Sequence, residues 1–329
     1  MEIEVVPIIE RLKAENGKIL LTTHENPDGD GIGGMLALYK FLKKKGKNVV
    51  CAMKDDVPYI YNFLPFVENI KKLPLNETFD LTIVVDAVGL HRVKAPVESK
   101  EVLRIDHHLG GDFNKSDYID PNAPSTTFLV GKLLREWDED AIDSDIATCI
   151  YTGLITDTGS FRYNNVDEKA FEMAKFLVKK GANPSYISTM IFERNKPNVI
   201  KLLTKTLSTL EIHYNGLIAS LVVRREFIEQ TGTTEEDTEG FVNYARSIEG
   251  VEVAFIMIQK PDRKTWRVSL RGKGKIPVRE IAKKFGGGGH RDAAGCRIEG
   301  GEYEVKRKLI ETATQIIQKT IVEKEHILI

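Results

Sequence analysis

Residues 20–34 read Leu20-Leu-Thr-Thr-His-Glu-Asn-Pro-Asp-Gly-Asp-Gly-Ile-Gly-Gly34, an apolar run that leads into a loop rich in glycine. The loop carries His24, Asp28 and Asp30, so one imidazole and two carboxylates lie close together in the chain. Converging carboxylates need a cation to hold them together, which makes a metal site the first hypothesis. The alternative is a helix that begins near Gly31 and is capped by Asp30, with His24 solvated at a strand end.

Length and composition limit the class of protein. A chain of 329 residues predicts two domains, and a net charge of -1 gives no global basic field, so we expect no long nucleic acid as a partner. Cys51, Cys149 and Cys296 lie far apart and predict neither a disulfide framework nor a cysteine zinc site. No signal peptide opens the chain and no apolar run approaches the ~20 residues of a membrane span, which predicts a cytoplasmic protein with no membrane contact.

Strand and helix patterns alternate in the first half of the chain, which predicts an α/β fold with a mostly parallel sheet flanked by helices. We expect strands at 18–23, 48–53, 81–85 and 102–105. We expect helices at 5–15, 32–45, 125–137, 144–155, 167–180, 184–192 and 197–211. In open sheets of this kind, ligands bind outside the carboxyl ends of the strands.

Three more groups of ligand-type side chains follow, each where a predicted strand or helix ends. They are Asp86, then Asp106-His107-His108, then Asp157. Taken singly, each has an ordinary explanation as a turn, a helix cap or a hydrogen-bonded polar pair. Their joint occurrence at the ends of elements favours a shared metal centre, because parallel strands deliver their ends to one edge.

The candidate metal ligands are four carboxylates and two imidazoles: His24, Asp28, Asp30, Asp86, His107 and Asp157. Hard oxygen and imidazole without thiolate favour Mn²⁺ over a structural zinc, with Mg²⁺, Co²⁺ and Fe²⁺ left open. Four carboxylates suit two divalent cations. A hydroxide that bridges two such ions, roughly 3.5–4 Å apart, can attack phosphorus near neutral pH.

The ordered motifs resemble those of the DHH phosphoesterases. They are His24-x3-Asp28-x-Asp30, Asp86, Asp106-His107-His108 and Gly153-Leu-Ile-Thr-Asp157-Thr-Gly. The resemblance implies one ion held by His24, Asp28 and Asp86, and a second held by Asp30, Asp86, His107 and Asp157. It also implies that His108 faces the phosphate as a hydrogen-bond donor or acid, and that Asp106 orients the histidines. Gly31 and Gly34 stand where the family often has Ala and Ser, which leaves the ligands unchanged.

A second informative segment reads Phe285-Gly-Gly-Gly-Gly-His-Arg-Asp-Ala-Ala-Gly295. One glycine suffices to end a helix, whereas four cost backbone entropy, so the close approach of a ligand is the better explanation. His290 and Arg291 would add donors. Upstream, Arg267 and Arg271 lie on or just after a predicted strand, where they either meet an anionic ligand or line a solvated strand face.

The glycine segment looks like the GGGH motif of the DHHA1 domain, which in the family binds the nucleotide part of the substrate. The resemblance therefore implies a set of substrate-binding residues: Arg271, Gly287, Gly288, Gly289 and His290. The second half predicts a smaller α/β domain. Its expected strands are 217–223, 251–258 and 266–270, and its expected helices are 239–248, 278–285 and 304–320. We predict a DHH catalytic domain at 1–192, a helical linker at 193–214 and a DHHA1 domain at 215–329.

This two-domain arrangement is similar to nanoRNase-type oligoribonucleases, which include pAp phosphatases and phosphodiesterases of cyclic di-AMP and pApA. We predict a Mn-dependent phosphodiesterase that releases 5′-mononucleotides from linear dinucleotides such as pApA, short oligoribonucleotides or cyclic di-AMP. A pAp phosphatase is the nearest alternative among enzymes. A catalytically idle nucleotide sensor is the alternative from another class, although such a sensor is expected to lack a ligand residue. The family resemblance also implies a homodimer.

Overall fold

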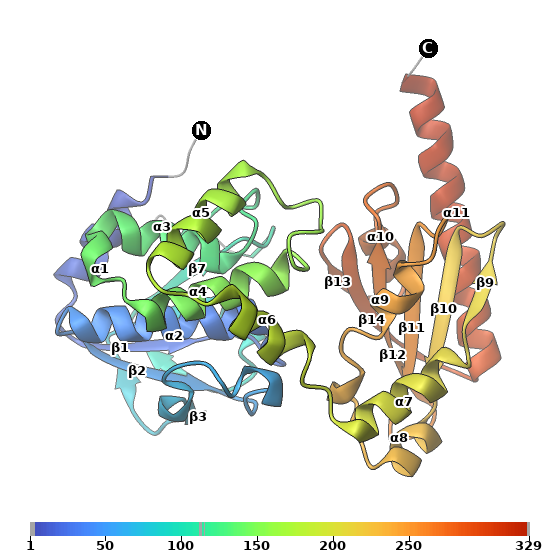
Figure 1. Cartoon of the computed structure of the whole chain (residues 1–329), viewed down its shortest axis with the longest axis horizontal. Coiled ribbons are helices and arrows are strands. Elements are labelled where there is room, and N and C mark those ends of the chain that lie inside the picture. Colours follow the sequence, from blue (N-terminus) through green and yellow to red (C-terminus); the bar gives the residue numbers. More distant parts are fainter. Residues whose placement is uncertain (1–3, 112–113, 115, 328–329) are drawn as a thin grey trace. The chain divides into compact units, whose positions relative to one another are not determined.

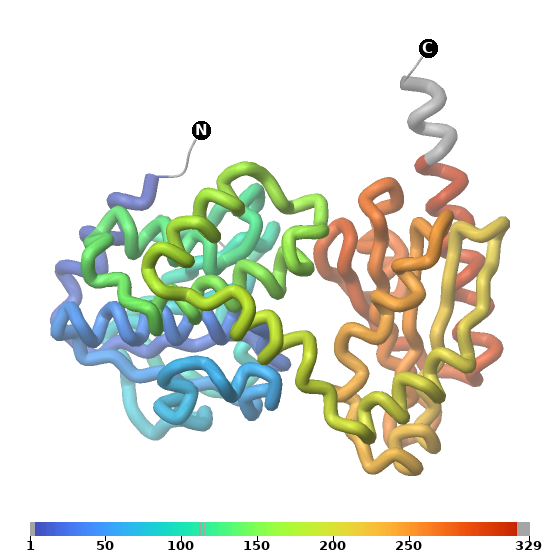
Figure 2. The backbone as a smooth tube through the Cα atoms, viewed as in Figure 1, coloured from blue at the N-terminus to red at the C-terminus, as the bar shows by residue number. Residues whose placement is uncertain are grey.

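The computed structural model describes residues 4–111, 114 and 116–327, with side chains through Thr320. The chain divides into two compact units, Met1–Arg194 and Asn195–Ile329. Each unit is built on a sheet with helices packed against it (Figure 1). Figure 2 traces the backbone, from blue to green through the first unit and from yellow to red through the second.

The first unit contains a six-stranded sheet in the order β3-β2-β1-β5-β7-β8, with every neighbouring pair parallel. Its strands are β1 (Lys18–Thr22), β2 (Asn48–Met53), β3 (Lys71–Lys72), β5 (Leu81–Val85), β7 (Val102–Asp106) and β8 (Tyr118–Ile119). Two short strands, β4 (Thr78–Phe79) and β6 (Glu98–Ser99), pair separately. The four strands predicted from continuous apolar runs all form, because the central strands are buried on both faces.

Helices cover one face of this sheet. They are α1 (Val6–Ala14), α2 (Gly29–Lys44), α3 (Thr126–Asp138), α4 (Ser144–Asp157), α5 (Glu168–Lys179) and α6 (Pro184–Phe192). Their apolar side chains pack with Ile19, Ile83 and Ile105 in one large core. The opposite face carries Leu20 and Val84, which pack under irregular segments and the short β4–β6 pair. The predicted parallel α/β fold is therefore confirmed, with the helices gathered on one side.

Helix α2 begins earlier than the sequence pattern predicts. The predicted start was residue 32, with Asp30 as the capping residue of the alternative interpretation. In the structure, Asp28 is the cap, and its Oδ1 accepts hydrogen bonds from the backbone N–H groups of Asp30 (3.0 Å) and Gly31 (3.1 Å). The apolar periodicity missed this first turn because it consists of glycines and Asp30, which lies inside the helix and is 1% exposed.

The second unit has a mixed sheet in the order β13-β14-β12-β11-β10-β9. Its strands are β9 (Glu211–His213), β10 (Ile218–Val223), β11 (Val253–Gln259), β12 (Thr265–Gly272), β13 (Gly288–Gly289) and β14 (Ala293–Glu299). Its helices are α7 (Pro197–Leu207), α8 (Arg225–Thr231), α9 (Val242–Arg246), α10 (Val278–Lys283) and α11 (Glu302–Ile327). Strands β10 and β11 are parallel, and the other neighbouring pairs are antiparallel.

Segment 193–214 was predicted to be a helical linker, and most of it contributes to the second unit. Helix α7 ends at Leu207 rather than near residue 211, and strand β9 follows it. Val199 and Leu202 of α7 are buried with Ile256 of the second sheet. This helix therefore packs as part of a core.

Strands β13 and β14 were missed because their residues have low strand propensity. The first half of β14 reads Ala-Ala-Gly-Cys, without the β-branched or aromatic residues that mark the other strands. Among the described residues, no helix combines the length and apolar character required to cross a bilayer.

Candidate functional site

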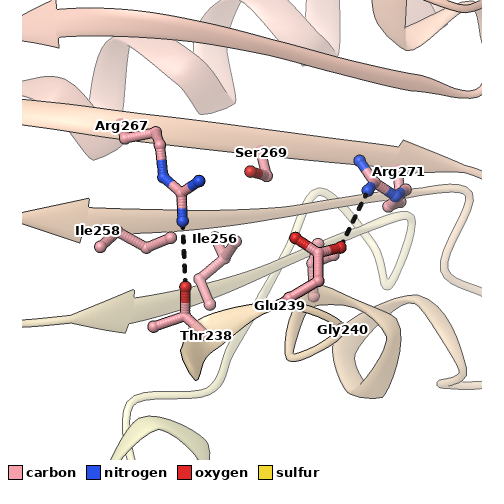
Figure 3. Close-up of a pocket in the computed structure, with 9 residues that line it drawn as sticks. Thr238, Glu239, Gly240, Ile256, Ile258, Arg267, Ser269 and Arg271 are labelled. Atoms are coloured by element: carbon pink, nitrogen blue, oxygen red, sulfur yellow. Dashed lines mark hydrogen bonds and ion pairs between the residues drawn. The ribbon is translucent and has the colours of Figure 1, made fainter. Parts of the chain in front are cut away.

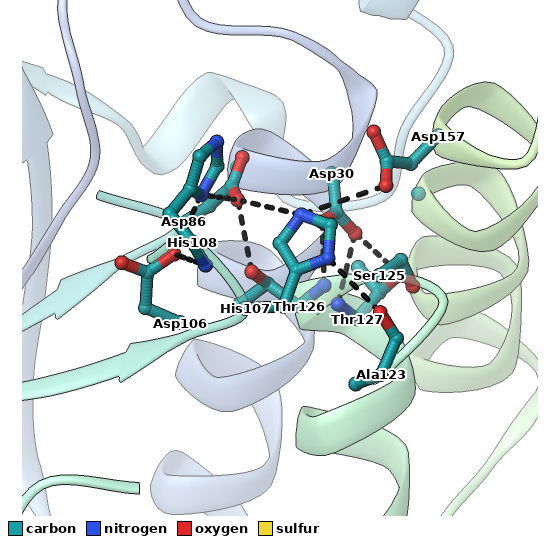
Figure 4. Close-up of polar contacts among 12 residues, drawn as sticks. Asp30, Asp86, Asp106, His107, His108, Ala123, Ser125, Thr126, Thr127 and Asp157 are labelled. Carbon is teal, nitrogen blue, oxygen red and sulfur yellow. Dashed lines mark hydrogen bonds and ion pairs between the residues drawn. The ribbon is translucent and has the colours of Figure 1, made fainter. Parts of the chain in front are cut away.

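The six predicted metal ligands meet at the carboxyl edge of the first sheet. Figure 4 shows four of them there: Asp30, Asp86, His107 and Asp157. His24 follows β1, Asp86 follows β5 and His107 follows β7, and these three strands are neighbours in the sheet. Asp28 and Asp30 stand at the N-terminus of α2, and Asp157 is the last residue of α4. The ends of parallel strands share one edge, so residues distant in the chain come together there.

The ligand atoms form two groups that share one carboxylate. His24, Asp28 and Asp86 form the first group, and Asp30, Asp86 and His107 form the second, with the ligand atoms of each group within 4.8 Å of one another. Asp157 joins the second group, since its Oδ2 lies 3.5 Å from Nε2 of His107. Asp86 is 3% exposed and adopts a left-handed backbone conformation with φ of 60°. This conformation is uncommon outside glycine but is accessible to Asp and Asn.

Each imidazole is held through its Nδ1 atom. Nδ1 of His24 lies 2.8 Å from the carbonyl oxygen of Glu25, and Nδ1 of His107 lies 3.1 Å from that of Ala123. A carbonyl can only accept a hydrogen bond, so Nδ1 carries the proton and Nε2 of the neutral ring keeps its lone pair. Both lone pairs then serve as metal donors, as in sites where a carbonyl orients the ligating histidine.

The spacing of donor atoms fits divalent cations. Nε2 of His107 lies 3.8 Å from Asp86 and 3.9 Å from Asp30, and Nε2 of His24 lies 3.5 Å from Asp86. Ligands bound to one ion at about 2.0–2.2 Å are separated by roughly 3–3.5 Å, so small movements would close these groups around an ion. The donors are carboxylate oxygen and imidazole nitrogen, the set that suits Mn²⁺ and other hard or borderline cations.

The N-terminus of α3 holds two of the carboxylates in place. Oδ2 of Asp30 accepts from the backbone N–H of Thr126 (2.6 Å), while Oδ1 accepts from the backbone N–H (2.8 Å) and the hydroxyl (2.6 Å) of Thr127. The hydroxyl of Thr126 donates to Oδ1 of Asp86 (2.8 Å). A helix N-terminus offers free N–H groups and a positive dipole end, so it stabilises these buried charges. One element thus orients a ligand from each group.

Close backbone packing brings α2, α3 and α4 to the site. A Cβ atom added at Gly33 would lie 2.4 Å from the carbonyl oxygen of Cys149, and one at Gly153 would lie 2.8 Å from Oδ1 of Asp30. Glycine is therefore required where these helices touch. The side-chain amide of Asn165 connects the end of α4 with the segment before α3, because its Nδ2 donates to the carbonyl oxygens of Asp157 (3.1 Å) and Pro124 (2.8 Å).

Asp106 and His108 lie beside the ligand groups and contact each other. Oδ1 of Asp106 accepts from Nδ1 (2.7 Å) and from the backbone N–H (3.0 Å) of His108. Nδ1 of His108 is also 3.4 Å from Oδ1 of Asp86. Both side-chain contacts are made by Nδ1 of the ring.

The electrostatics of the cluster favour added positive charge. Burial acts against protonation, but the carboxylates of Asp86 and Asp28 raise the pKa of His24 to about 9. Burial likewise opposes the charged ring of His107, and Asp157, Asp30 and Asp86 raise its pKa to about 9. Burial raises the pKa of Asp157 to about 6, together with neighbouring carboxylates. Without a metal, the site takes up protons in place of cations.

The predicted substrate residues all lie in the second unit, and two of them, Arg271 and Gly288, share one face of its sheet. Gly288 of β13 is paired with Gly295 of β14, which is paired with Ser269 of β12. Directly paired residues point to the same face, and Arg267 and Arg271 flank Ser269 at alternate positions of β12. We refer to this set, Arg267, Ser269, Arg271, Gly288 and Gly295, as the open face.

A shallow pocket lies on the open face (Figure 3). Arg267, Ser269 and Arg271 form one wall, and Thr238 and Glu239 lie opposite. Arg267 is fixed by hydrogen bonds of its Nη2 to the carbonyl oxygen of Glu235 and the hydroxyl of Thr238, both 3.2 Å. Nη2 of Arg271 is only within 3.9 Å of Glu239, so its guanidinium retains donors for an anion.

The structure changes the explanation of the glycine run. A Cβ atom at Gly287 would lie 2.1 Å from the carbonyl oxygen of Gly295, and one at Gly289 would lie 2.5 Å from that of Ala293. Pairing with β14 therefore already requires glycine at these two positions. A Cβ atom at Gly288 would meet nothing within 4 Å, which leaves Gly288 as the position where a ligand can approach the backbone. His290 follows β13 and is partly exposed.

Several polar residues of the site were not predicted. Thr126, Thr127 and Asn165 had no metal-ligand chemistry to attract notice. The sequence did contain one signal, since Ser125-Thr-Thr before an apolar helical pattern is typical of a helix N-terminus. Ser125 is indeed the N-cap of α3.

Comparison with known proteins gives consistent matches. Residues 18–154 match the family described as DHH family, N-terminal domain, and residues 214–319 match the DHHA1 domain. A Thermus thermophilus protein named bifunctional oligoribonuclease and PAP phosphatase NrnA is 34% identical over 89% of this chain and 88% of its own length. The Bacillus subtilis protein of the same name is 28% identical over 85% of this chain and 89% of its own.

Two further matches extend the comparison. The cyclic-di-AMP phosphodiesterase PdeA of Listeria monocytogenes is 25% identical over 88% of this chain, which corresponds to 46% of the PdeA length. The crystal structure of an exopolyphosphatase-related protein from Bacteroides fragilis superposes with a TM-score of 0.87 and 26% identity, over 97% of this chain and 98% of that one.

Proposed function

Because the chain belongs to the DHH family and carries a DHHA1 domain, and is thus a hydrolase of phosphodiester bonds, we propose that its substrates are short nucleotides. The specific reaction is the hydrolysis of linear dinucleotides such as pApA, short oligoribonucleotides or cyclic di-AMP to 5′-mononucleotides. The observation that carries the proposal is the pair of ligand groups that share Asp86. The names of the Thermus, Bacillus and Listeria relatives support this substrate class.

The proposed cofactor is two divalent cations, with Mn²⁺ preferred. One ion would be held by His24, Asp28 and Asp86, and the other by Asp30, Asp86, His107 and Asp157. When bound, the two ions would supply a water of lowered pKa as nucleophile and would neutralise charge on the phosphate. The carboxylate and imidazole donors, the shared Asp86 and the donor spacing support this assignment.

His108 is proposed to act on the phosphate. Its Nδ1 donates to Asp106, so Nε2 is the atom presented to the substrate. Burial opposes protonation of the ring, but the hydrogen bond and charge of Asp106, with the charge of Asp86, raise the pKa of His108. The protonated ring donates from Nε2 to a phosphate oxygen or to the departing oxygen.

The open face is proposed to bind the nucleotide. Two guanidinium groups separated by a small serine can hold a terminal phosphate, and Gly288 and Gly295 leave room for a ligand to lie against the sheet. Within the predicted set, Arg271 and Gly288 have this direct role, and His290 is an additional donor. Gly287 and Gly289 support it indirectly by pairing β13 with β14.

The test is a product assay with Mn²⁺ and five substrates: pApA, cyclic di-AMP, a short RNA, pAp and pyrophosphate. We expect mononucleotide release from at least one of the first three. Phosphate release from pAp would add the second activity, which the names of the two bacterial relatives favour. Hydrolysis of pyrophosphate alone would overturn the substrate proposal, and no turnover with intact metal binding would favour a nucleotide sensor.

We also propose that the protein is a cytoplasmic homodimer. Family membership supports the dimer, and light scattering of the purified chain tests it directly.

A further inference from the structure

Arg104 is an unexpected residue for its position. It lies in the middle of β7, opposite Val84 of the neighbouring strand β5, and its side chain is only 4% exposed. Arginine is almost never fully buried without partners, because removing its charge from water is costly. Its partners therefore indicate what it does.

The guanidinium of Arg104 links three segments of the site edge. Its Nη2 donates to Oδ2 of Asp106 (2.8 Å) and to the carbonyl oxygen of Gly110 (3.3 Å), and its Nε donates to the carbonyl oxygen of Ala87 (3.2 Å). Ala87 directly follows Asp86, and Gly110 lies in the loop that follows His108. The planar fork of arginine has donors on separate atoms, which suits acceptors on three segments, whereas the donors of lysine all lie on one nitrogen.

The two oxygens of Asp106 have separate partners. Oδ2 accepts from Arg104, while Oδ1 accepts from Nδ1 and from the backbone N–H of His108. The carboxylate is fully buried, so without the guanidinium its charge would lack a cation on the Oδ2 side. A carboxylate held at both oxygens cannot rotate, and the ring that it holds is fixed in turn.

We propose that Arg104 is a positioning residue for His108. By holding Asp106 and the carbonyl oxygen of Gly110, it fixes the orientation of the His108 ring and keeps Nδ1 engaged, so that Nε2 faces the phosphate. This inference rests on the proposed function, in which His108 contacts the phosphate. It assigns Arg104 no contact with substrate or metal.

A double-mutant cycle tests the proposal. The variants are Arg104→Lys, which keeps the charge but not the fork, His108→Gln, and the double variant. We expect Arg104→Lys to lower kcat about tenfold with KM changed less than about twofold, in the range seen when a residue that orients an active group is lost. In the His108→Gln background, the same change should alter kcat by less than about twofold, because Arg104 acts through His108.

Metal binding and a matched arginine provide the controls. Titration with Mn²⁺ should give a dissociation constant within about threefold of wild type for Arg104→Lys, since the six ligands are not touched. Arg11→Lys is the matched control, because Arg11 also bridges carboxylates in the same unit, at the other end of β7. It should leave kcat unchanged. Additive losses in the cycle, or an unchanged kcat in Arg104→Lys, would overturn the proposal.

A second measurement does not depend on the substrate. Hydrogen exchange of the Mn²⁺-loaded protein should be faster in residues 107–111 of Arg104→Lys than of wild type, while α4 keeps its protection. Unchanged exchange in 107–111 would count against the proposal even if kcat fell.

If Arg104→Lys does not fold, Arg104→Gln replaces it, since it avoids a buried ammonium. If wild type hydrolyses no nucleotide, the proposed function fails, whereas the exchange result and a cycle run on bis(p-nitrophenyl) phosphate still decide the role of Arg104.

Discussion

The edge of the first sheet and the open face of the second sheet represent two different ways to build a site. At the edge, charged side chains come from strand ends and helix ends, and both oxygens of Asp30 and one of Asp86 accept hydrogen bonds from Thr126 and Thr127. On the open face, small residues and two arginines lie along strands, and Arg271 makes one weak ion pair with Glu239 and donates one hydrogen bond to the carbonyl oxygen of Leu270. The first site is rigid before a ligand arrives, whereas the second offers space and positive charge.

The difference concerns what each site must do. A centre for cations brings like charges together, so it needs fixed donors around every carboxylate. A face for a nucleotide needs access, and its binding groups must keep some donors for the ligand. We therefore expect substitutions at the edge to affect turnover and metal affinity, and substitutions on the open face to affect KM.

The largest effect is expected for Asp86→Asn. Asn fits the same volume and also tolerates the left-handed backbone at this position, so the fold should remain. Loss of the shared carboxylate charge should lower kcat by at least about a thousandfold and reduce the number of bound Mn²⁺ ions. Turnover of pApA, circular dichroism and metal titration measure these outcomes. Asp140→Asn, at an exposed site, should behave as wild type, and an active Asp86→Asn would refute the metal assignment.

The second largest effect is expected when the hydroxyl groups at the start of α3 are removed. Thr126→Val and Thr127→Val keep the backbone N–H groups but remove the hydroxyl donors to Asp86 and Asp30. Each should weaken Mn²⁺ binding about 10–100-fold, and added metal should restore much of the activity. Thr204→Val removes a hydroxyl from an exposed helix position and is the control. Equal Mn²⁺ affinity in all three variants would show that the hydroxyls are dispensable.

Substitutions at two neighbouring glycines can distinguish a role in strand pairing from a role in ligand binding. Gly289→Ala should lower the unfolding midpoint by at least about 4 °C, because φ is 135° and the new methyl would meet Ala293. Gly288→Ala adds a methyl into open space, so it should leave the midpoint unchanged and raise KM about fivefold with kcat retained. Thermal scans and steady-state kinetics distinguish the two. A wild-type KM in Gly288→Ala would show that the substrate does not approach the backbone at this position.

The smallest effect is a dependence of metal stabilisation on pH. The raised pKa values of His24 and His107, both about 9, mean that proton binding stabilises the metal-free fold. That contribution is complete below the unfolded pKa of 6.5 and is lost as pH rises through about 9. The gain in unfolding midpoint from EDTA to Mg²⁺ should therefore be larger at pH 9 than at pH 6.5, by at least about 4 °C. A gain that shrinks with pH would contradict this, and Asp86→Asn should show little gain at either pH.

The sequence predicted the edge of the first sheet well because its ligands follow continuous apolar strands. Asp86 and His107 could be placed from strand ends alone, and the structure puts Asp86 beside both His24 and His107. The residues that hold the ligands in place were harder to predict, since Thr126 and Asn165 act through ordinary hydrogen bonds. Arg104 did leave a signal, because it is a charged residue among the apolar residues of a predicted strand, and a buried arginine requires a partner.

The open face could be predicted only in pieces. Arg271 and the glycines were singled out separately, and nothing in the sequence indicated that Gly288, Gly295 and Ser269 are cross-strand neighbours. That relation depends on the register of β14, and this strand could not be predicted because its small residues have low strand propensity. The glycine run was interpreted as a response to a ligand, although two of its members are fixed by backbone pairing.

The contact of α2 with α4 at Gly33 and Gly153 has a consequence for the geometry of the second ligand group, which contains Asp30 and Asp157. Asp30 and Asp157 are carried by helices whose main chains touch, so the interval between these ligands is determined by positions that bear no reactive group. A methyl at Gly33 would meet the main chain of α4, and one at Gly153 would meet the side chains of Thr127 and Asp30, so either would distort the centre while every donor remained present. A variant that keeps all six ligands could thus be inactive, because the helices that carry the ligands are displaced.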